Sequence, residues 1–315
     1  MKVALISRVD YAGSGYRISE SVNTNSKIFS EYFVYFPVGF PENLARYPSV
    51  FVGENTDGEA TEVTLPAESS HRLKTLFSSA DIIHLKGDEP PSEYYLDALK
   101  VKPKKLIATV HGSYFRGLED FSAFDVADLR TVGDPTLAYE GFDCIFTQIP
   151  YPTHRFKPTW KKGNVIAHSP SAQGKKGTAK FKEAIKMLKA VGYDVKSDII
   201  EGVSYDECLK RKSEATIFFD QSEVGWYGNS AVEAMAFGIP TLAYIAPEAF
   251  KGAQGKLDNM PPIDCGNSVE SIYGAIKAIL DGDMAEQSKA MRKWAVDFHS
   301  YKTVGEMWSK IYKGL

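Results

Sequence analysis

The sequence predicts an α/β protein made of two domains in which parallel strands alternate with helices. Apolar runs of four to six residues recur along the chain and are separated by longer amphipathic stretches, a pattern typical of such folds. The pattern occurs in both halves, and a chain of 315 residues more readily supports two hydrophobic cores than one. We therefore expect two domains, with the boundary near residue 160.

The expected strands fall into two groups of short, strand-favouring runs. The first half supplies Val3–Ile6, Tyr32–Phe36, Ile82–Leu85, Leu106–Val110 and Cys144–Thr147. The second half supplies Asn164–Ala167, Val195–Ile200, Thr216–Phe219 and Thr241–Ile245.

Helix and hinge signals lie between these runs. Phe181, Ile185 and Leu188 have helical spacing, and residues 204–207 form a capping-box pattern that opens another helix. The segment 150–164 holds three prolines and is the expected hinge. We expect an N-terminal domain at 1–158, a C-terminal domain at 159–295 and a final helix at 296–315 that returns to the first domain.

Composition indicates a globular protein of the cytoplasm. Hydrophobic residues make up 43% of the chain, but no apolar stretch reaches the roughly 20 residues that a membrane span needs. The apolar run after Met1 is too short for a signal-peptide core. Three widely spaced cysteines fit neither a disulfide framework nor a zinc site.

Charge is distributed unevenly between the halves. Residues 1–150 hold 14 Lys and Arg against 21 Asp and Glu, whereas the rest of the chain holds 23 against 19. We expect phosphates to bind in the second half, and no extended nucleic-acid surface on the first. One local cluster, Lys100, Lys102, Lys104 and Lys105, is either a solvated loop or a nucleic-acid contact.

Ligands bind beyond the carboxyl ends of parallel strands, so the residues after each run are informative. Gly13, Ser14 and Gly15 follow the first strand, and their backbone amides are candidates to bind an anion, with Tyr16 and Arg17 beside them. The alternative is a tight turn from strand to helix. The loop is not a dinucleotide fingerprint, because Ile18 stands where a third glycine is required.

His111 ends another buried strand and is followed by Gly112. A lone histidine is usually structural, but its place at a strand end favours a role in binding, and Arg116 follows it. His84 ends a neighbouring strand without a glycine and is expected to be core or cleft lining.

Two loops of the second half carry polar residues. Residues 169–178 combine hydroxyls, glycines and lysines before a helix, which suits a diphosphate, although composition alone favours a solvated, lysine-rich loop. A glycine-rich loop at 220–229 leads into an apolar helix that contains Glu233. Ser230 and Glu233 also fit a capping box, in which Glu233 only accepts a backbone amide.

The run from Gly228 to Thr241, Gly-Asn-Ser-Ala-Val-Glu-Ala-Met-Ala-Phe-Gly-Ile-Pro-Thr, resembles the signature of GT-B glycosyltransferases of the family 4 type. Those enzymes use nucleotide sugars and retain the anomeric configuration. Lys176-Gly177-Thr178, His111-Gly112-Ser113 and the N-terminal glycine loop occur in the family's order. The resemblance implies two Rossmann-like domains facing each other across a cleft, with the donor on the C-terminal side and the acceptor on the N-terminal side.

The resemblance assigns roles residue by residue. It makes His111, Lys176 and Glu233 the catalytic candidates: Glu233 holds the donor ribose, Lys176 the diphosphate, and His111 lies beside the transferred sugar. Gly202 and Val203 face the nucleobase. The full set expected at the donor is Gly13, Ser14, Gly15, Ser169, Ser171, Lys175, Lys176, Gly202, Val203, Tyr227, Gly228, Asn229, Ser230 and Glu233, and the acceptor side is expected to be Tyr16, Arg17, His111 and Arg116.

Two positions depart from the family pattern. The family places a second glutamate eight residues before the conserved one, and here that residue is Gly225, so Asp220 or Glu223 is the candidate substitute. An arginine common in the family is replaced by Pro170. We expect Lys175, Ser169 and Ser171 to share its work on the phosphate.

The expected reaction is metal-independent sugar transfer, in which amides and a lysine stabilise the leaving nucleoside diphosphate. The leaving phosphate would take the acceptor proton, and His111 would position rather than react. The single Asp-x-Asp, residues 281–283, is expected to be a turn.

A UDP sugar is the first expectation for the donor and a GDP sugar the second. The acceptor stays open between a glycan, a lipid, a small molecule and a modified base of viral DNA. The alternatives are a nucleotide-sugar epimerase on the same scaffold and a non-catalytic sugar-nucleotide sensor.

Overall fold

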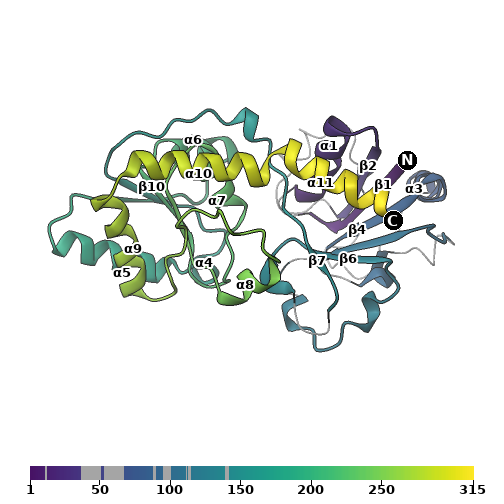
Figure 1. The fold of residues 1–315 in the computed structure, drawn as a ribbon, viewed down its shortest axis with the longest axis horizontal. Coiled ribbons are helices and arrows are strands. Elements are labelled where there is room, and N and C mark those ends of the chain that lie inside the picture. Colours follow the sequence, from purple (N-terminus) through teal and green to yellow (C-terminus); the bar gives the residue numbers. More distant parts are fainter. Residues whose placement is uncertain are drawn as a thin grey trace. The chain divides into compact units, whose positions relative to one another are not determined.

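The computed structural model describes residues 1–10, 13–36, 51–52, 67–87, 90–94, 101–110, 112, 115–138 and 142–315. The chain forms two compact units. Unit 1 contains Met1–Pro150 and Tyr301–Leu315, and unit 2 contains Tyr151–Ser300. Figure 1 follows the chain through both units by colour.

Unit 1 is a parallel sheet with helices on both faces. Its strands are β1 (Lys2–Val9), β2 (Phe29–Phe36), β3 (Phe51–Val52), β4 (Ile82–Lys86), β5 (Leu106–Val110), β6 (Leu129–Val132) and β7 (Ile145–Phe146). Its helices are α1 (Ser14–Asn25), α3 (Ala67–Ser79) and α11 (Tyr301–Gly314), with short 3-10 turns η1 (Pro91–Tyr94), η2 (Phe115–Gly117), η3 (Ser122–Phe124) and η4 (Pro135–Leu137). The seven strands run in the order β3-β2-β1-β4-β5-β6-β7, and every pairing is parallel.

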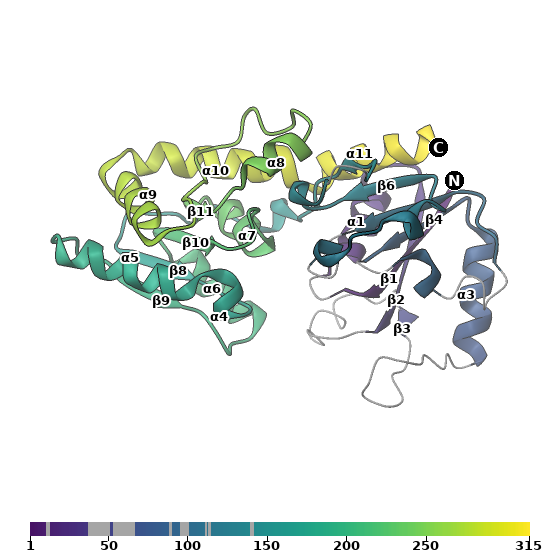
Figure 2. The same cartoon turned by 90° about the horizontal axis from the view of Figure 1, so that it is seen from below.

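The core of unit 1 follows from the alternation of side chains along β1. Ala4 and Ile6 pack on one face with Leu73 and Phe77 of α3, whereas Val3 and Leu5 pack on the other face with residues of α1 and α11. Successive strand residues point to opposite faces, so an uninterrupted apolar run is what a sheet covered on both sides requires. Figure 2 shows α3 and α11 on different sides of the sheet.

Helix α11 is bound closely to α1. A Cβ at Gly305 would lie 2.2 Å from the carbonyl oxygen of Ser21, so only glycine allows the two backbones to approach this far. Trp308 and Tyr312 of α11 are fully buried in the core beneath. In Figure 1 helix α11 accordingly lies beside α1.

Unit 2 is a smaller parallel sheet in the order β11-β10-β8-β9. Its strands are β8 (Val165–His168), β9 (Lys196–Ile199), β10 (Ile217–Gln221) and β11 (Thr241–Ala243). Its helices are η5 (Thr153–Arg155), α4 (Gln173–Lys176), α5 (Thr178–Ala190), α6 (Tyr205–Ser213), α7 (Asn229–Ala236), α8 (Pro247–Gly252), α9 (Val269–Asp281) and α10 (Met284–His299).

Helices cover both faces of this sheet as well. Phe181, Ile185 and Leu188, one stripe of α5, pack with α9 against Ile166, and each such buried side chain contributes about 2 kcal/mol. The other face receives Ala234 of α7 against Phe218. Both faces therefore exclude water from the strands whose carboxyl ends form the site described below.

The chain crosses between the units at Pro150–Tyr151 and at Ser300–Tyr301. The first crossing lies before the expected boundary near residue 160, because Tyr151 and Phe156 belong to the second unit. The Tyr151 amide donates to the His299 carbonyl, and Phe156 packs on Phe237. The expected final helix at 296–315 starts instead at Tyr301, since the extended Ser300 separates α10 from α11.

Candidate functional site

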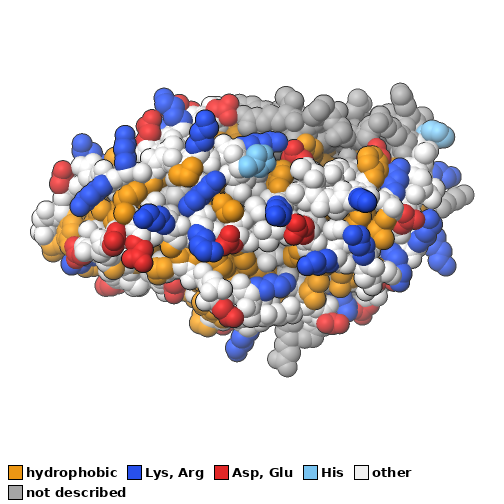
Figure 3. Space-filling view, turned by 45° about the horizontal axis from the view of Figure 1, so that its top comes forward, with side chains coloured by type: hydrophobic (Ala, Val, Ile, Leu, Met, Phe, Trp, Pro, Cys, Tyr) orange, Lys and Arg blue, Asp and Glu red, His pale blue; other side chains and the backbone are white. Residues whose placement is uncertain are grey.

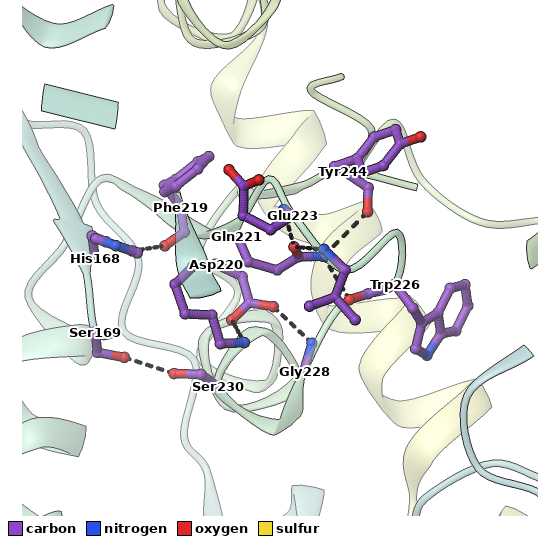
Figure 4. Close-up of polar contacts among 12 residues, drawn as sticks. His168, Ser169, Phe219, Asp220, Gln221, Glu223, Trp226, Gly228, Ser230 and Tyr244 are labelled. Carbon is purple, nitrogen blue, oxygen red and sulfur yellow. Dashed lines mark hydrogen bonds and ion pairs between the residues drawn. The ribbon is translucent and has the colours of Figure 1, made fainter. Parts of the chain in front are cut away.

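The carboxyl ends of β8 and β10 are neighbours in the sheet of unit 2. Phe219 pairs with His168, so the residues that come next, Ser169 just after β8 and Asp220 near the end of β10, lie side by side. Figure 4 shows these residues together with the first turn of α7.

The segment after β8 brings a lysine to this edge. Lys176 ends the short helix α4, and its Nζ lies 3.7 Å from Asp220 Oδ1. Gly177 follows with φ 73°, and a Cβ there would lie 2.0 Å from Ser222 Oγ, so glycine is required for the close approach of the two loops. Ser171 and Lys175 are exposed, and Ser169 is half-buried.

Asp220 and Glu223 are the two candidates to replace the glutamate missing at residue 225, and of these Asp220 is buried. It is 2% exposed, and its Oδ2 accepts the Gly228 amide at 2.7 Å. A Cβ at Gly228 would lie 3.3 Å from Lys176 Nζ. The ammonium of Lys176 therefore lies at the residue that precedes α7. Glu223, the other candidate, is partly exposed and pairs with Lys180 at 2.8 Å.

Gln221 fixes the loop that leads from β10 to α7. Its Oε1 accepts the amides of Glu223 and Val224 at 2.6 and 2.7 Å, and its Nε2 donates to the Trp226 carbonyl at 2.7 Å. Gln221 is fully buried, so these bonds replace those that water would make. Figure 4 shows its side chain at the centre of the loop, and sequence reasoning gave it no role.

Residue 225 has no room for a side chain. Gly225 has φ 81°, and a Cβ there would lie 2.7 Å from the Cβ of Ala246. The glutamate that the family places at this position is incompatible with the loop as it stands.

Tyr227 is a buried anchor. Its hydroxyl lies 2.9 Å from His299 Nε2 and accepts from Trp294 Nε1 at 3.1 Å. Burial raises the pKa of Tyr227 well above its usual value. The side chain thus ties the loop to α10, which leaves its backbone as the part available to a ligand.

Helix α7 begins with free donors. Its N-cap is Gly228, which supplies no side-chain cap. The first amides of a helix have no intrahelical partner, and together with the helix dipole they favour an anion. Here those amides belong to Asn229 and Ser230, beside Lys176.

Glu233 takes part in no capping box. Its Oε2 accepts from Lys212 Nζ at 2.6 Å, and its Oε1 accepts the hydroxyls of Tyr205 and Tyr151 at 2.8 and 3.0 Å. The carboxylate is 4% exposed. The alternative in which Glu233 accepts a backbone amide is wrong, because α7 starts two residues too early for Ser230 to be its N-cap.

The partners of Glu233 were missed by sequence reasoning. Tyr205, Cys208 and Lys212 recur at helical spacing on α6, and this spacing was the available signal that they share a face. That face turns toward α7. Before α6, Gly202 has φ 65° and Val203 is 39% exposed, so both lie open at the end of β9.

His168, the last residue of β8, is fully buried behind the sheet edge formed by the carboxyl ends of β8 and β10. Its Nε2 lies 2.8 Å from Thr178 Oγ1 and its Nδ1 lies 2.9 Å from the Phe219 carbonyl. Burial lowers the pKa of His168. The neutral ring therefore links the start of α5 to β10 and does not face the open edge.

The glycine loop of unit 1 is closed by the carboxylate of Asp10. The Asp10 carboxylate accepts the amides of Ser14 and Gly15 at 2.9 and 2.8 Å and also the Tyr32 hydroxyl at 2.8 Å. The amides expected to bind an anion are already bonded to a carboxylate, which repels a phosphate. The loop is therefore a tight turn from strand to helix in this structure, and the assignment of Gly13, Ser14 and Gly15 to the donor stays a prediction.

The other expected residues of unit 1 are engaged or lie outside the described residues. Arg17 is 6% exposed and donates to the Pro150 carbonyl, and Tyr16 packs edge-on against Tyr32. Arg116 is paired with Asp134, whose pKa is raised by burial despite this partner. His111 and Ser113 lie outside the described residues, between β5 and η2.

Two further expectations concern ions and membranes. In the described ranges, no three His, Cys, Asp or Glu side chains are grouped to hold a metal ion. Asp283 caps α10, and Asp281 is ion-paired with Lys277, so residues 281–283 form the expected turn. Of the helices in the described parts of the chain, none is long and apolar enough to cross a bilayer.

No protein-family model matches the sequence, and no curated protein matches it either. Solved structures do match along the whole chain. An alpha-glucosyltransferase in complex with UDP-glucose and DNA has a TM-score of 0.67 at 13% identity, with 99% of both chains covered. HepE of Anabaena in complex with UDP and glucose has a TM-score of 0.68 at 10% identity, with 100% of both covered.

A sucrose-phosphate synthase from Thermosynechococcus elongatus has a TM-score of 0.65 at 12% identity, covering 100% of this chain and 98% of that one. At these identities the similarity shows the fold. This chain has the GT-B fold of nucleotide-sugar glycosyltransferases, with two Rossmann-like units.

Proposed function

We propose that this chain transfers a sugar from a nucleoside-diphosphate sugar to an acceptor hydroxyl. The observation that carries the proposal is the meeting of the α7 amides, Lys176 and Ser169 at the edge formed by β8 and β10. An ammonium and unpaired helix amides suit a diphosphate. Structural neighbours hold UDP or UDP-glucose, which favours a UDP sugar over a GDP sugar.

In the proposed reaction, the bond between the anomeric carbon and the phosphate oxygen breaks as the acceptor oxygen bonds to that carbon. The acceptor proton passes to the leaving phosphate, and the configuration is retained. Lys176 and the amides of Asn229 and Ser230 stabilise the charge that develops on the leaving group. No metal takes part, and the role of His111 stays a prediction.

Glu233 would bind the donor ribose. Its Oε1 already accepts two tyrosine hydroxyls, one of which belongs to the half-buried Tyr205. A ribose hydroxyl would take the place of the Tyr205 hydroxyl, so the carboxylate exchanges one hydroxyl partner for another. Gly202 and Val203, just before α6, would lie along the nucleobase.

We favour a glycan or a small molecule as the acceptor over DNA. One neighbour contains DNA, but Lys104 and Lys105 are paired with Asp81 and Asp128 here. Figure 3 shows Lys and Arg side chains scattered among acidic ones.

The three cysteines form no disulfide, in keeping with a reducing cytoplasm.

The test begins with a thermal-shift panel of UDP, GDP, ADP and CMP sugars, followed by calorimetry with the sugar that binds. Lys176→Met should weaken that binding by about tenfold or more, because a charge-assisted contact to phosphate is lost. Lys182→Met, which removes an exposed lysine of α5, is the control and should bind like wild type.

Glu233→Ala should lose donor affinity and transfer. Full donor affinity together with a lower melting temperature would show that Glu233 is only structural. Product analysis separates the rival functions. Conversion of the donor sugar without any acceptor would indicate an epimerase, and binding without hydrolysis or transfer would indicate a sensor.

A further inference from the structure

Lys212 is a buried ammonium that the proposed reaction does not use directly. It lies on α6, is 3% exposed, and its Nζ is 2.6 Å from both Glu233 Oε2 and Ser230 Oγ. The same Nζ lies 5.4 Å from the centre of the Phe218 ring. An ammonium has three N–H donors and no acceptor. Each of the three therefore has a partner: a carboxylate, a hydroxyl and a ring face.

The charge of Lys212 is maintained by Glu233. Burial lowers the pKa of Lys212, but the attraction and hydrogen bond of the Glu233 carboxylate, together with Cys208 and Asp220, more than offset this, and the net shift is upward. The two charges cancel, so Lys212 adds little net attraction for a distant phosphate. Its influence on a ligand must pass through the groups that it orients.

The ammonium sets the direction of a hydroxyl chain. Because Lys212 can only donate, Ser230 Oγ must accept from it. Ser230 Oγ is also 2.7 Å from Ser169 Oγ, and this is the acceptor available for the single proton of Ser230. Ser230 is half-buried, so a protein acceptor at this distance is the favoured partner for its proton. The proton of Ser230 therefore points to Ser169, and that of Ser169 is left to point outward.

Ser169 stands where this outward proton is useful. It is half-buried at the end of β8, the strand end beside Asp220 and the start of α7. Figure 4 shows its hydroxyl directed at Ser230 from the β8 side. Because Ser169 Oγ accepts the proton of Ser230, its own proton is available to a ligand, which suits an anion.

We propose that Lys212 is a positioning residue that holds the Glu233 carboxylate for the ribose and, through Ser230, turns the Ser169 hydroxyl into a donor to the diphosphate. The proposal rests on the function proposed above. It couples recognition of the two parts of the donor through one buried side chain. Neither Lys212 nor its link to Ser169 follows from the signature around Glu233.

The test compares UDP with uridine by calorimetry, because only UDP carries the diphosphate. Ser230→Ala breaks the hydroxyl chain but leaves the pair of Lys212 and Glu233 in place. It should lower affinity for UDP by about tenfold and leave that for uridine unchanged. Ser230→Thr keeps a hydroxyl and should restore UDP binding. Ser169→Ala should match Ser230→Ala, and the double variant should lose no more than either single one.

Lys212→Met should weaken both UDP and uridine binding, whereas Lys210→Met, on the exposed side of α6, should change neither. If Lys212→Met does not fold, the Ser230 and Ser169 variants still decide the matter. An unchanged ratio of UDP to uridine affinity in Ser230→Ala, or additive losses in the double variant, would overturn the inference. A wild-type chain that binds none of the nucleoside diphosphates in the panel would instead overturn the proposed function.

Discussion

Residue 225 is a glycine in a left-handed backbone conformation, at φ 81°, directly against Ala246. The Ala246 amide donates to the Gly225 carbonyl at 2.9 Å, which fixes the loop at this point. An L-residue here would meet both a strained backbone and a steric overlap. The absence of a glutamate at residue 225 is therefore built into the backbone of the loop rather than being a matter of the side chain alone.

Gly225→Ala should lower the free energy of unfolding by about 2 kcal/mol, from the strained φ and the contact with Ala246. Chemical denaturation followed by circular dichroism measures this. Gly274→Ala is the matched control, since Gly274 lies inside α9 and its Cβ would meet nothing within 4 Å. That variant should gain about 0.5–1 kcal/mol. Equal stability of Gly225→Ala and wild type would mean that the loop readily adopts another conformation.

Sequence reasoning brought residues together correctly where two loops follow neighbouring strands of one sheet. The approach of Lys176 to the start of α7 was expected from two separate loops, and both end at the same sheet edge. It failed where a residue depends on distant partners. Glu233 is bound by residues 82, 28 and 21 positions away, and no spacing within α7 encodes them. In the N-terminal glycine loop, Asp10, four residues before Ser14, accepts the amides of Ser14 and Gly15, and the glycine pattern alone does not show this.

At the scale of elements, the connection from β10 to α7 depends on Gln221. This side chain bonds the amides of Glu223 and Val224 and the Trp226 carbonyl, all within the loop, and also the carbonyl of Tyr244, which follows β11, at 3.3 Å. Without the Gln221 side chain, these amides and carbonyls would lack the hydrogen bonds that it makes with them. The loop thus holds its shape from a buried amide group, and the start of α7 is positioned by the same bonds.

Gln221→Leu should destabilise the chain by about 3 kcal/mol, because two buried amides lose their acceptor. Hydrogen exchange should speed up at the amides of Glu223 and Val224, and nucleotide affinity should fall. Gln173→Leu makes the same chemical change on exposed α4, where the side chain bonds only to Glu201, and should leave loop exchange unchanged. Unaltered exchange at residues 223 and 224 in Gln221→Leu would exclude this role for Gln221.

The strands with continuous apolar runs were predictable, and the structure contains all nine of them with ends shifted by a few residues. The two that were missed have weak signals. β6 is Leu-Arg-Thr-Val, with only partial burial at its first two residues, and β3 has two residues. The final helix was expected at 296–315, whereas α11 starts at Tyr301, and only the extended backbone of Ser300 shows where α10 ends.

At the scale of the whole molecule, the fold followed from the repeated strand and helix pattern and from the resemblance in the signature around Glu233. Full-length similarity to solved GT-B structures confirms it. The places where the chain crosses between the units were less predictable, because prolines mark a turn but not which core the flanking aromatic residues join. Tyr151 and Phe156 decide this by long-range contacts.

The return of the chain to unit 1 is secured by a buried polar chain. His84 of β4 lies 2.8 Å from the Tyr312 hydroxyl of α11 through Nδ1 and 2.6 Å from Thr109 Oγ1 through Nε2. Its ring packs on Trp308 at 4.6 Å between centroids. Burial is the main cause that lowers the pKa of His84 to about 3, and Lys86 adds to it. The first and last parts of the sequence are therefore joined by a neutral histidine.

This pKa makes the stability of unit 1 depend on pH in one direction. Below about pH 6.5 the unfolded chain takes up a proton at His84 that the folded chain does not, so the free energy of unfolding should fall by about 1.4 kcal/mol per pH unit on acidification, and His84 should have no effect above neutrality. Urea unfolding followed by tryptophan fluorescence at several pH values measures the slope. The asparagine side chain of His84→Asn does not titrate, so this variant should be less stable at neutral pH, and its free energy of unfolding should fall less steeply on acidification, by the contribution of one proton. The buried His168 is present in both proteins, so its contribution cancels in the comparison. Parallel slopes for the two proteins would show that His84 can be protonated within the fold.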